Sequence, residues 1–239
     1  SWKNAQEKKY FLHSLLSRVA DRPLPEIDII DLRAEKDNQK RPQNLPFWLS
    51  GSLYKKMILA IENKEQVALL LNRRGMANLV FCQSCGYSAD CPNCDISLTL
   101  HAKSHLVCHY CDYHQNFTLK CPQCSNGELT ALGLGKELIE TDLKKLFPDL
   151  EIARADRDEI QSRLDMENLI ADMESEKINI LVGTQMIAKG LDFPKLNLVG
   201  LVLADVGFNL PDFRATEKSF QLITQMSGRS GRHVSALGA

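Results

Sequence analysis

The sequence INILVGTQMIAKGLDFP, residues 178–194, decides the fold class of this chain. Its first six residues form an apolar run with the length of a buried strand, and the run leads into a glycine-bearing turn. Backbone N–H groups that are free at such a turn favour anions such as phosphate. The stretch therefore predicts a buried strand followed by an anion-binding connection.

Apolar runs and helical periodicities alternate on both sides of this stretch. Further strands are expected at 67–72, 150–155 and 196–203, and helices at 52–61, 138–147, 164–173 and 215–226. Such an alternation predicts an α/β fold in which helices flank a parallel sheet and right-handed crossovers join the strands. Nearer the amino terminus, we expect a short helix at 5–16 and a strand at 23–31 that follows a proline-marked turn.

Eight cysteines interrupt this alternation. They form four Cys-x-x-Cys pairs, namely Cys82/Cys85, Cys91/Cys94, Cys108/Cys111 and Cys121/Cys124. Two residues between the thiolates allow both sulfurs to turn toward one ion at ~2.3 Å, so the eight cysteines predict two closed four-sulfur zinc sites. Because such sites leave no position for water or substrate, their role is structural. A disulfide framework is the alternative, but nothing in the sequence is secretory.

The spacing of the pairs favours a nested arrangement of the two sites. One site would use Cys91, Cys94, Cys108 and Cys111, and the other would use Cys82, Cys85, Cys121 and Cys124. A cross-braced arrangement remains open. Four histidines of the same segment, His101, His105, His109 and His114, are expected at the surface or beside the sites, because the cysteines already fill both.

The cysteine segment divides the chain. We expect residues 82–124 to form an inserted two-zinc module, and residues 1–81 and 125–239 to form two parts of one lobe. The formal net charge of −1 gives no overall basic field, so contacts with nucleic acid would depend on local groups. No stretch approaches the ~20 apolar residues that cross a bilayer, and no signal-peptide pattern is present. We therefore expect a cytoplasmic protein without a membrane partner.

A second motif, QMSGRSGR at residues 225–232, lies at the end of the last expected helix. Its glycines let the backbone approach a ligand closely, and its two arginines, three residues apart, project onto one side of a helical turn. Planar guanidinium groups suit bidentate contacts with phosphate. By itself the motif could also be a solvated basic turn.

The motifs together resemble those of superfamily-two helicases. Residues 183–194 resemble motif V, residues 225–232 resemble motif VI, and the expected sheet is similar to a RecA-like helicase lobe. Three further stretches, LNRRG at 71–75, CPNCDISLTLH at 91–101 and NLPDFR at 209–214, make the sequence similar to the PriA family of replication-restart DNA helicases.

This resemblance implies a role for each motif residue. Arg229 and Arg232 would be the catalytic arginine fingers, and Thr184 would contact a DNA phosphate. The nucleotide would be bound by Gly190, Asp192, Gln225 and Gly228. The resemblance also implies the nested order of the zinc sites and ATP-dependent 3′-to-5′ movement on single-stranded DNA and forks, followed by loading of primosome proteins.

The sequence contains no G-x-x-x-x-G-K-[ST] motif, and Asp158-Glu159 does not begin a D-E-x-H box. ATP and Mg²⁺ are therefore expected to bind only together with a first lobe, and this chain alone is expected to lack ATPase activity. A hypothesis from another class is a non-enzymatic, zinc-dependent adaptor whose cysteine module binds DNA or protein.

Overall fold

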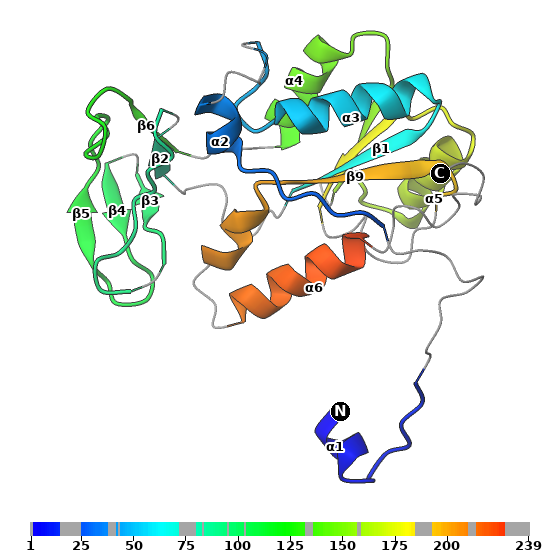
Figure 1. Ribbon diagram of the computed structural model, residues 1–239, viewed down its shortest axis with the longest axis horizontal. Helices are drawn as coiled ribbons and strands as arrows, with labels where there is room; N and C mark the ends of the chain where they lie inside the picture. Colours follow the sequence, from blue (N-terminus) through cyan, green and yellow to red (C-terminus); the bar gives the residue numbers. More distant parts are fainter. Residues whose placement is uncertain are drawn as a thin grey trace.

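A four-stranded parallel sheet forms the centre of the larger part of the molecule (Figure 1). The computed structural model describes residues 2–14, 25–37, 42, 44–71, 80–82, 84–94, 96–102, 104–131, 136–156, 159–184, 193–209 and 214–227. The strand order is β7-β8-β1-β9, with bounds Ile152–Ala155, Ile180–Gly183, Gln66–Leu71 and Leu196–Val202. All neighbouring strands run parallel, so each connection must return from one end of the sheet to the other.

The central strand β1 is buried along its whole length. Its side chains alternate between two hydrophobic cores, with Val67, Leu69 and Leu71 in the first core and Ala68 and Leu70 in the second. A strand that is buried on both faces requires a helical layer on each of them.

Two pairs of helices supply these layers. The first core contains residues of α3 (Gly51–Glu62) and α4 (Lys136–Leu146), and the second contains residues of α5 (Arg163–Glu174) and α6 (Ala215–Ser227). The expected α/β architecture, a parallel sheet flanked by helices, is confirmed. No helix in the described parts of the chain has the length and apolar character that crossing a membrane requires.

The amino terminus of α3 is capped from two directions. The Ser50 hydroxyl accepts a hydrogen bond from the Leu53 N–H at 2.9 Å. The carboxylate of Glu35, from the short helix α2 (Leu32–Asp37), accepts bonds from the N–H groups of Gly51 at 2.6 Å and Ser52 at 3.0 Å. A negative charge at this position also complements the helix dipole, so the segment before the sheet is tied to its first core layer.

Two expectations near the amino terminus were wrong. The helix expected at 5–16 is the short α1 (Trp2–Gln6), and residues 7–14 are not helical. The strand expected at 23–31 is absent over the described residues 25–31, where the side chain of Ile29 is 96% exposed. Three isoleucines within four residues are typical of a strand, but the described part of the sheet offers this segment no hydrogen-bonded neighbour.

The cysteine segment lies beside the sheet as a separate small body (Figure 1). Strands β2 (Val80–Cys82) and β6 (Leu129–Ala131) pair antiparallel where the segment leaves and rejoins the lobe. A three-stranded antiparallel sheet follows, in the order β3 (Thr99–His101), β4 (His105–Val107) and β5 (His114–Asn116). The segment has its own hydrophobic core, which includes most of its cysteines.

One aromatic contact joins this small body to the lobe. The rings of Phe47 and Phe81 lie 5.4 Å apart between centroids, and both side chains pack against the first core of the sheet. Phe81 is the middle residue of β2, so the base of the cysteine segment is anchored on the α3 side of the lobe.

Gln66 ties the start of β1 to the turn between α5 and β8. Its buried Nε2 atom donates to the carbonyl oxygens of Met173 at 2.8 Å and Ile178 at 2.9 Å. We expect Gln66→Leu to lower the free energy of unfolding by about 2 kcal/mol, because it leaves two buried carbonyl groups without these donors. Urea unfolding of the whole chain measures this, with the exposed Gln221→Leu as the control. Equal stability of the two variants would contradict the assignment.

Candidate functional site

The eight cysteine sulfurs gather into two groups of four. One group contains Cys82, Cys85, Cys121 and Cys124, the other contains Cys91, Cys94, Cys108 and Cys111, and in each the sulfurs lie within 4.8 Å of one another. This is the nested arrangement that the spacing favoured, and it differs from the cross-braced alternative. The group that contains Cys82 is the outer one, because its cysteines lie nearest the two ends of the segment. It forms where β2 and β6 pair, and this pairing brings the two ends together.

The distances between sulfurs suit a tetrahedral ion. Three of the sulfur pairs are Cys82 and Cys124 at 3.8 Å, Cys85 and Cys121 at 3.6 Å, and Cys91 and Cys111 at 3.6 Å. Four thiolates at ~2.3 Å from zinc would lie ~3.8 Å apart along each tetrahedral edge, whereas a disulfide requires ~2.05 Å. The residues therefore fit zinc, and the cysteines are free thiols without disulfide bonds.

The backbone repeats one conformation around the cysteine pairs. The N–H of the first cysteine in each pair donates to a carbonyl beyond the second cysteine, at 2.8 Å for Cys82 and Cys108 and at 2.9 Å for Cys91 and Cys121. The residue after the second cysteine has a positive φ in three pairs: Gly86 (76°), Asp112 (56°) and Ser125 (57°). The fourth such residue, Asp95, lies outside the described residues.

This conformation directs backbone N–H groups at the sulfurs. The Asn93 N–H donates to Cys91 Sγ and the Tyr110 N–H donates to Cys108 Sγ, both at 3.4 Å. A backbone hydrogen bond from Asn126 lowers the pKa of Cys124 to about 6, and one from Tyr113 lowers the pKa of Cys111 to about 7. Both donors favour the thiolate, which is the form that binds a metal.

The remaining sulfurs cannot all ionise without a cation. Loss of solvation raises the pKa of Cys94 to about 12, and its thiol neighbours Cys111 and Cys108 add to this effect. Four negative charges at these separations would repel one another strongly. A divalent cation at the centre removes the repulsion, so the sulfur groups have the chemistry of closed structural metal sites.

The histidines of the segment do not enter either sulfur group. His101, His105, His109 and His114 are all exposed, as expected for side chains outside the sites.

Only some of the residues of motifs V and VI lie in the described parts of the chain. Thr184 directly follows β8, and its N–H donates to the Ala155 carbonyl at the carboxyl end of β7. Gln225 is exposed in the last turn of α6. The other motif residues, Gly190, Asp192, Gly228, Arg229 and Arg232, lie outside the described residues.

The structure separates the two ends of motif V. Thr184 lies at the carboxyl end of β8, whereas Phe193 comes just before the amino end of the parallel strand β9. Phe193 is buried in the same core as Met226, which follows Gln225 in motif VI. The residue near the end of motif V and the one near the start of motif VI therefore belong to the same hydrophobic core.

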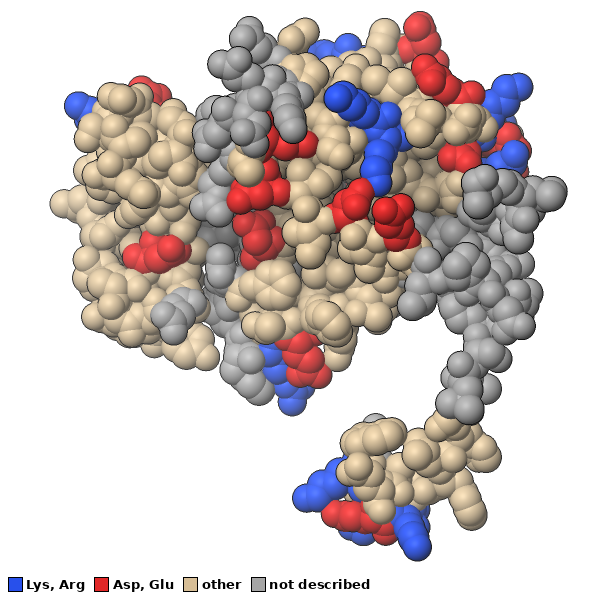
Figure 2. Space-filling view, viewed as in Figure 1, with Lys and Arg blue, Asp and Glu red and all other residues tan. Residues whose placement is uncertain are grey.

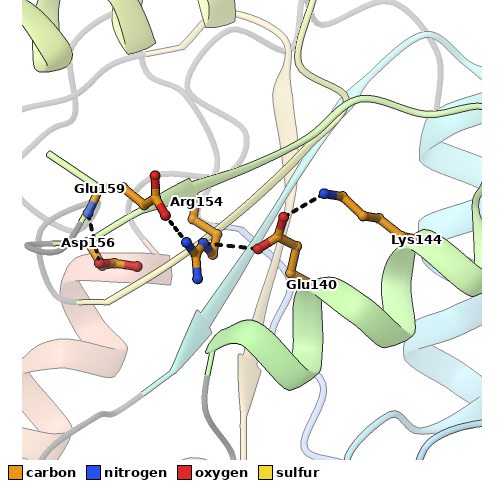
Figure 3. A network of polar contacts seen from close by, with 5 residues as sticks. All are labelled: Glu140, Lys144, Arg154, Asp156 and Glu159. Carbon is orange, nitrogen blue, oxygen red and sulfur yellow. Dashed lines mark hydrogen bonds and ion pairs between the residues drawn. The ribbon is translucent and has the colours of Figure 1, made fainter.

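A polar network that the sequence reasoning missed lies around Arg154 (Figure 3). Arg154 of β7 forms ion pairs with Glu140 of α4, at 3.0 Å, and with Glu159 of the following loop. The Glu159 N–H in turn donates to the fully buried Asp156. An arginine within the strand expected at 150–155 was the available signal, and the network ties Glu140 and Glu159 to β7.

The two sulfur groups differ in exposure. Cys111 is exposed, whereas none of the cysteines in the group with Cys82 is. We expect chelator-driven zinc release from the whole chain to have two phases, with the site of Cys111 emptying first. Absorbance of a colorimetric zinc chelator measures both phases. Cys111→Ser should remove the fast phase and Cys124→Ser the slow one, and a fast phase that survives Cys111→Ser would refute the assignment.

Gly127 leaves room for the sulfur of Cys82. A Cβ atom at this position would lie 2.5 Å from Cys82 Sγ and 2.7 Å from the side chain of Ser84. We expect Gly127→Ala to displace the sulfur and to reduce the bound zinc from two ions to one. Native mass spectrometry counts the ions, and the neighbouring exposed Asn126→Ala is the control. Retention of both ions by Gly127→Ala would show that the site can adapt.

Both the cysteine segment and the lobe match known protein families. Residues 91–115 match the PriA DNA helicase Cys-rich region (CRR) domain, and residues 135–234 match the helicase conserved C-terminal domain. The first match contains the sulfur group of Cys91, and the second contains motifs V and VI.

Sequence similarity to other proteins extends over nearly the whole chain. The replication restart protein PriA of Bacillus subtilis is 42% identical over 98% of this chain, and that of Rickettsia conorii is 41% identical over 96%. The protein of the same name from Haemophilus influenzae is 37% identical over 96%. The chain spans only 28%, 35% and 30% of these relatives, respectively. The chain is therefore similar to PriA proteins over nearly all of its length, with one region that matches a helicase C-terminal domain and another that matches the PriA Cys-rich region.

Proposed function

We propose that this chain is the second motor lobe of an ATP-dependent 3′-to-5′ DNA helicase that acts in replication restart and primosome assembly. Its motif residues would act on a nucleotide that a first lobe binds together with Mg²⁺. The name of the relatives, replication restart protein, supports the biological role. The burial of Phe193 and Met226 in one hydrophobic core supports the mechanism.

The observation that most supports this proposal is that Phe193 and Met226 are buried in the same hydrophobic core. Asp192 precedes Phe193 in the chain and Gln225 precedes Met226. On this ground we assign Asp192 and Gln225, with Gly190, Gly228, Arg229 and Arg232 of the same two motifs, to the binding of one nucleotide. The guanidinium groups of Arg229 and Arg232 would neutralise charge on the phosphoryl group during its transfer.

Thr184 would have a different partner from this cluster. It lies at the carboxyl end of β8, where the sheets of α/β proteins offer their loops to ligands. The Ala155 carbonyl at the end of β7 accepts the Thr184 N–H, and the neighbouring Arg154 pairs with Glu159. We assign this edge to a phosphate of single-stranded DNA, so that motif V connects the DNA contact at one end of the sheet to the nucleotide at the other.

The cysteine groups would each hold one structural Zn²⁺ ion. The ions would fix the turns around the cysteines and so the shape of a module that we extend to 80–131, because β2 and β6 pair at its base. This module would serve as a strand-separating wedge or as a docking surface for primosome proteins. The face of the module that Figure 2 shows has few charged side chains, so contacts of the module on this face would depend on uncharged groups.

The groove between module and lobe does not suit DNA. It has a volume of about 1340 Å³, and Glu26, Asp28, Asp31 and Asp205 line it together with the single described cation Lys56. Such an acidic lining repels phosphate, so the DNA path would follow the loop edge near Thr184 instead.

The test requires the chain joined to its first lobe. We expect Arg229→Ala in that protein to lower DNA-stimulated ATP hydrolysis by ~10³-fold, because an arginine finger stabilises the transition state. Arg163→Ala is the matched control, since its side chain is 92% exposed on α5, and it should leave the rate unchanged. Equal rates for both variants would reject the motor function and favour the zinc-dependent adaptor.

A further inference from the structure

Two histidines of the cysteine module face each other at its surface. The Nε2 atoms of His101 and His109 lie 3.1 Å apart, and the ring centroids lie 5.0 Å apart with planes inclined at 65°. His101 ends β3, and His109 lies inside the turn between Cys108 and Cys111. Both side chains are exposed, and neither belongs to a sulfur group.

The separation of the two nitrogens suits a shared cation. Imidazole nitrogens bind zinc at ~2.0–2.1 Å, which places two of them ~2.9 Å apart at right angles and ~3.4 Å apart in a tetrahedron. The observed 3.1 Å lies between these values. A hydrogen bond between two neutral rings is the competing explanation, since it has a similar length.

The backbone holds both rings in this arrangement. His101 pairs with His105 across the β3–β4 hairpin, and its carbonyl accepts the Ser104 N–H at 3.1 Å. His109 is held by the Cys108 turn, in which the Asp112 N–H donates to the Cys108 carbonyl at 3.0 Å. Two ligands fixed in advance lose little conformational entropy when they bind an ion.

We propose that His101 and His109 form a third metal site, open to solvent, for a divalent ion that prefers imidazole ligands, such as Zn²⁺, Ni²⁺ or Cu²⁺. Two protein ligands leave the other coordination positions to water or to an anionic oxygen, so this ion would exchange, unlike those in the four-sulfur groups. The inference depends on the folded cysteine module and not on the motor function proposed above.

His105 is not part of this site. Its Nδ1 atom contacts the Ser104 hydroxyl at 2.7 Å, and no third nitrogen or oxygen ligand among the described residues completes a group with the pair. The site would therefore be weaker than the sulfur groups and would fill after them.

The experiment uses the whole chain loaded with two zinc ions and titrated with Ni²⁺. Native mass spectrometry should find one nickel ion in addition to both zinc ions, and calorimetry should give its affinity. We expect His101→Gln and His109→Gln each to weaken nickel binding by at least tenfold, because each removes one of two ligands while glutamine can still form a hydrogen bond. The double variant should bind little more weakly than either single variant.

His114→Gln is the control, since His114 is another exposed histidine of the same sheet and should leave the affinity unchanged. Three results would overturn the proposal: no nickel beyond the two zinc ions, an equal loss of affinity in His114→Gln, or loss of a zinc ion from His101→Gln. The last result would show that the pair supports the neighbouring sulfur group, and the zinc count separates this outcome from the others.

Discussion

Burial of β1 on both faces, between parallel neighbours on both edges, is the constraint on which the rest of the structure depends. The strand pairs with β8 on one side and with β9 on the other. Its alternating side chains require helices on both faces, and α3 with α4 and α5 with α6 provide them. Since parallel strands need crossover connections, Thr184 lies at the carboxyl end of one strand and Phe193 lies just before the amino end of another.

The cysteine segment depends on a different source of stability. It leaves the lobe after β1 and returns before α4, and its own hydrophobic core is small. Small bodies of this kind gain stability from metal coordination, because their apolar burial alone is limited. Pairing of β2 with β6 closes the base of the segment, so the insertion adds a second body without disturbing the pairing order of the main sheet.

The two bodies also handle charge in different ways. In the cysteine module, backbone N–H groups and a central cation would share the charge of the thiolates. In the lobe, Arg154 compensates Glu140 and Glu159 beside the edge where motif V begins. Both arrangements join separate segments of the chain by electrostatic means, and both lie close in the chain to residues to which we assign a function.

The sequence by itself determined the elements whose signals are local. Strand-length apolar runs predicted β1 and β8, and the Cys-x-x-Cys spacing predicted four metal-binding turns, because two residues between the thiolates suffice to form each one. Tertiary structure decided what depends on distant partners. The segment expected as a strand at 23–31 formed none over its described part, and the choice between nested and cross-braced sites required the pairing of β2 with β6. Thr184 and Phe193 of motif V came to lie at opposite ends of parallel strands. Local periodicity shows which faces can be buried, but only the folded chain supplies the neighbour that buries them.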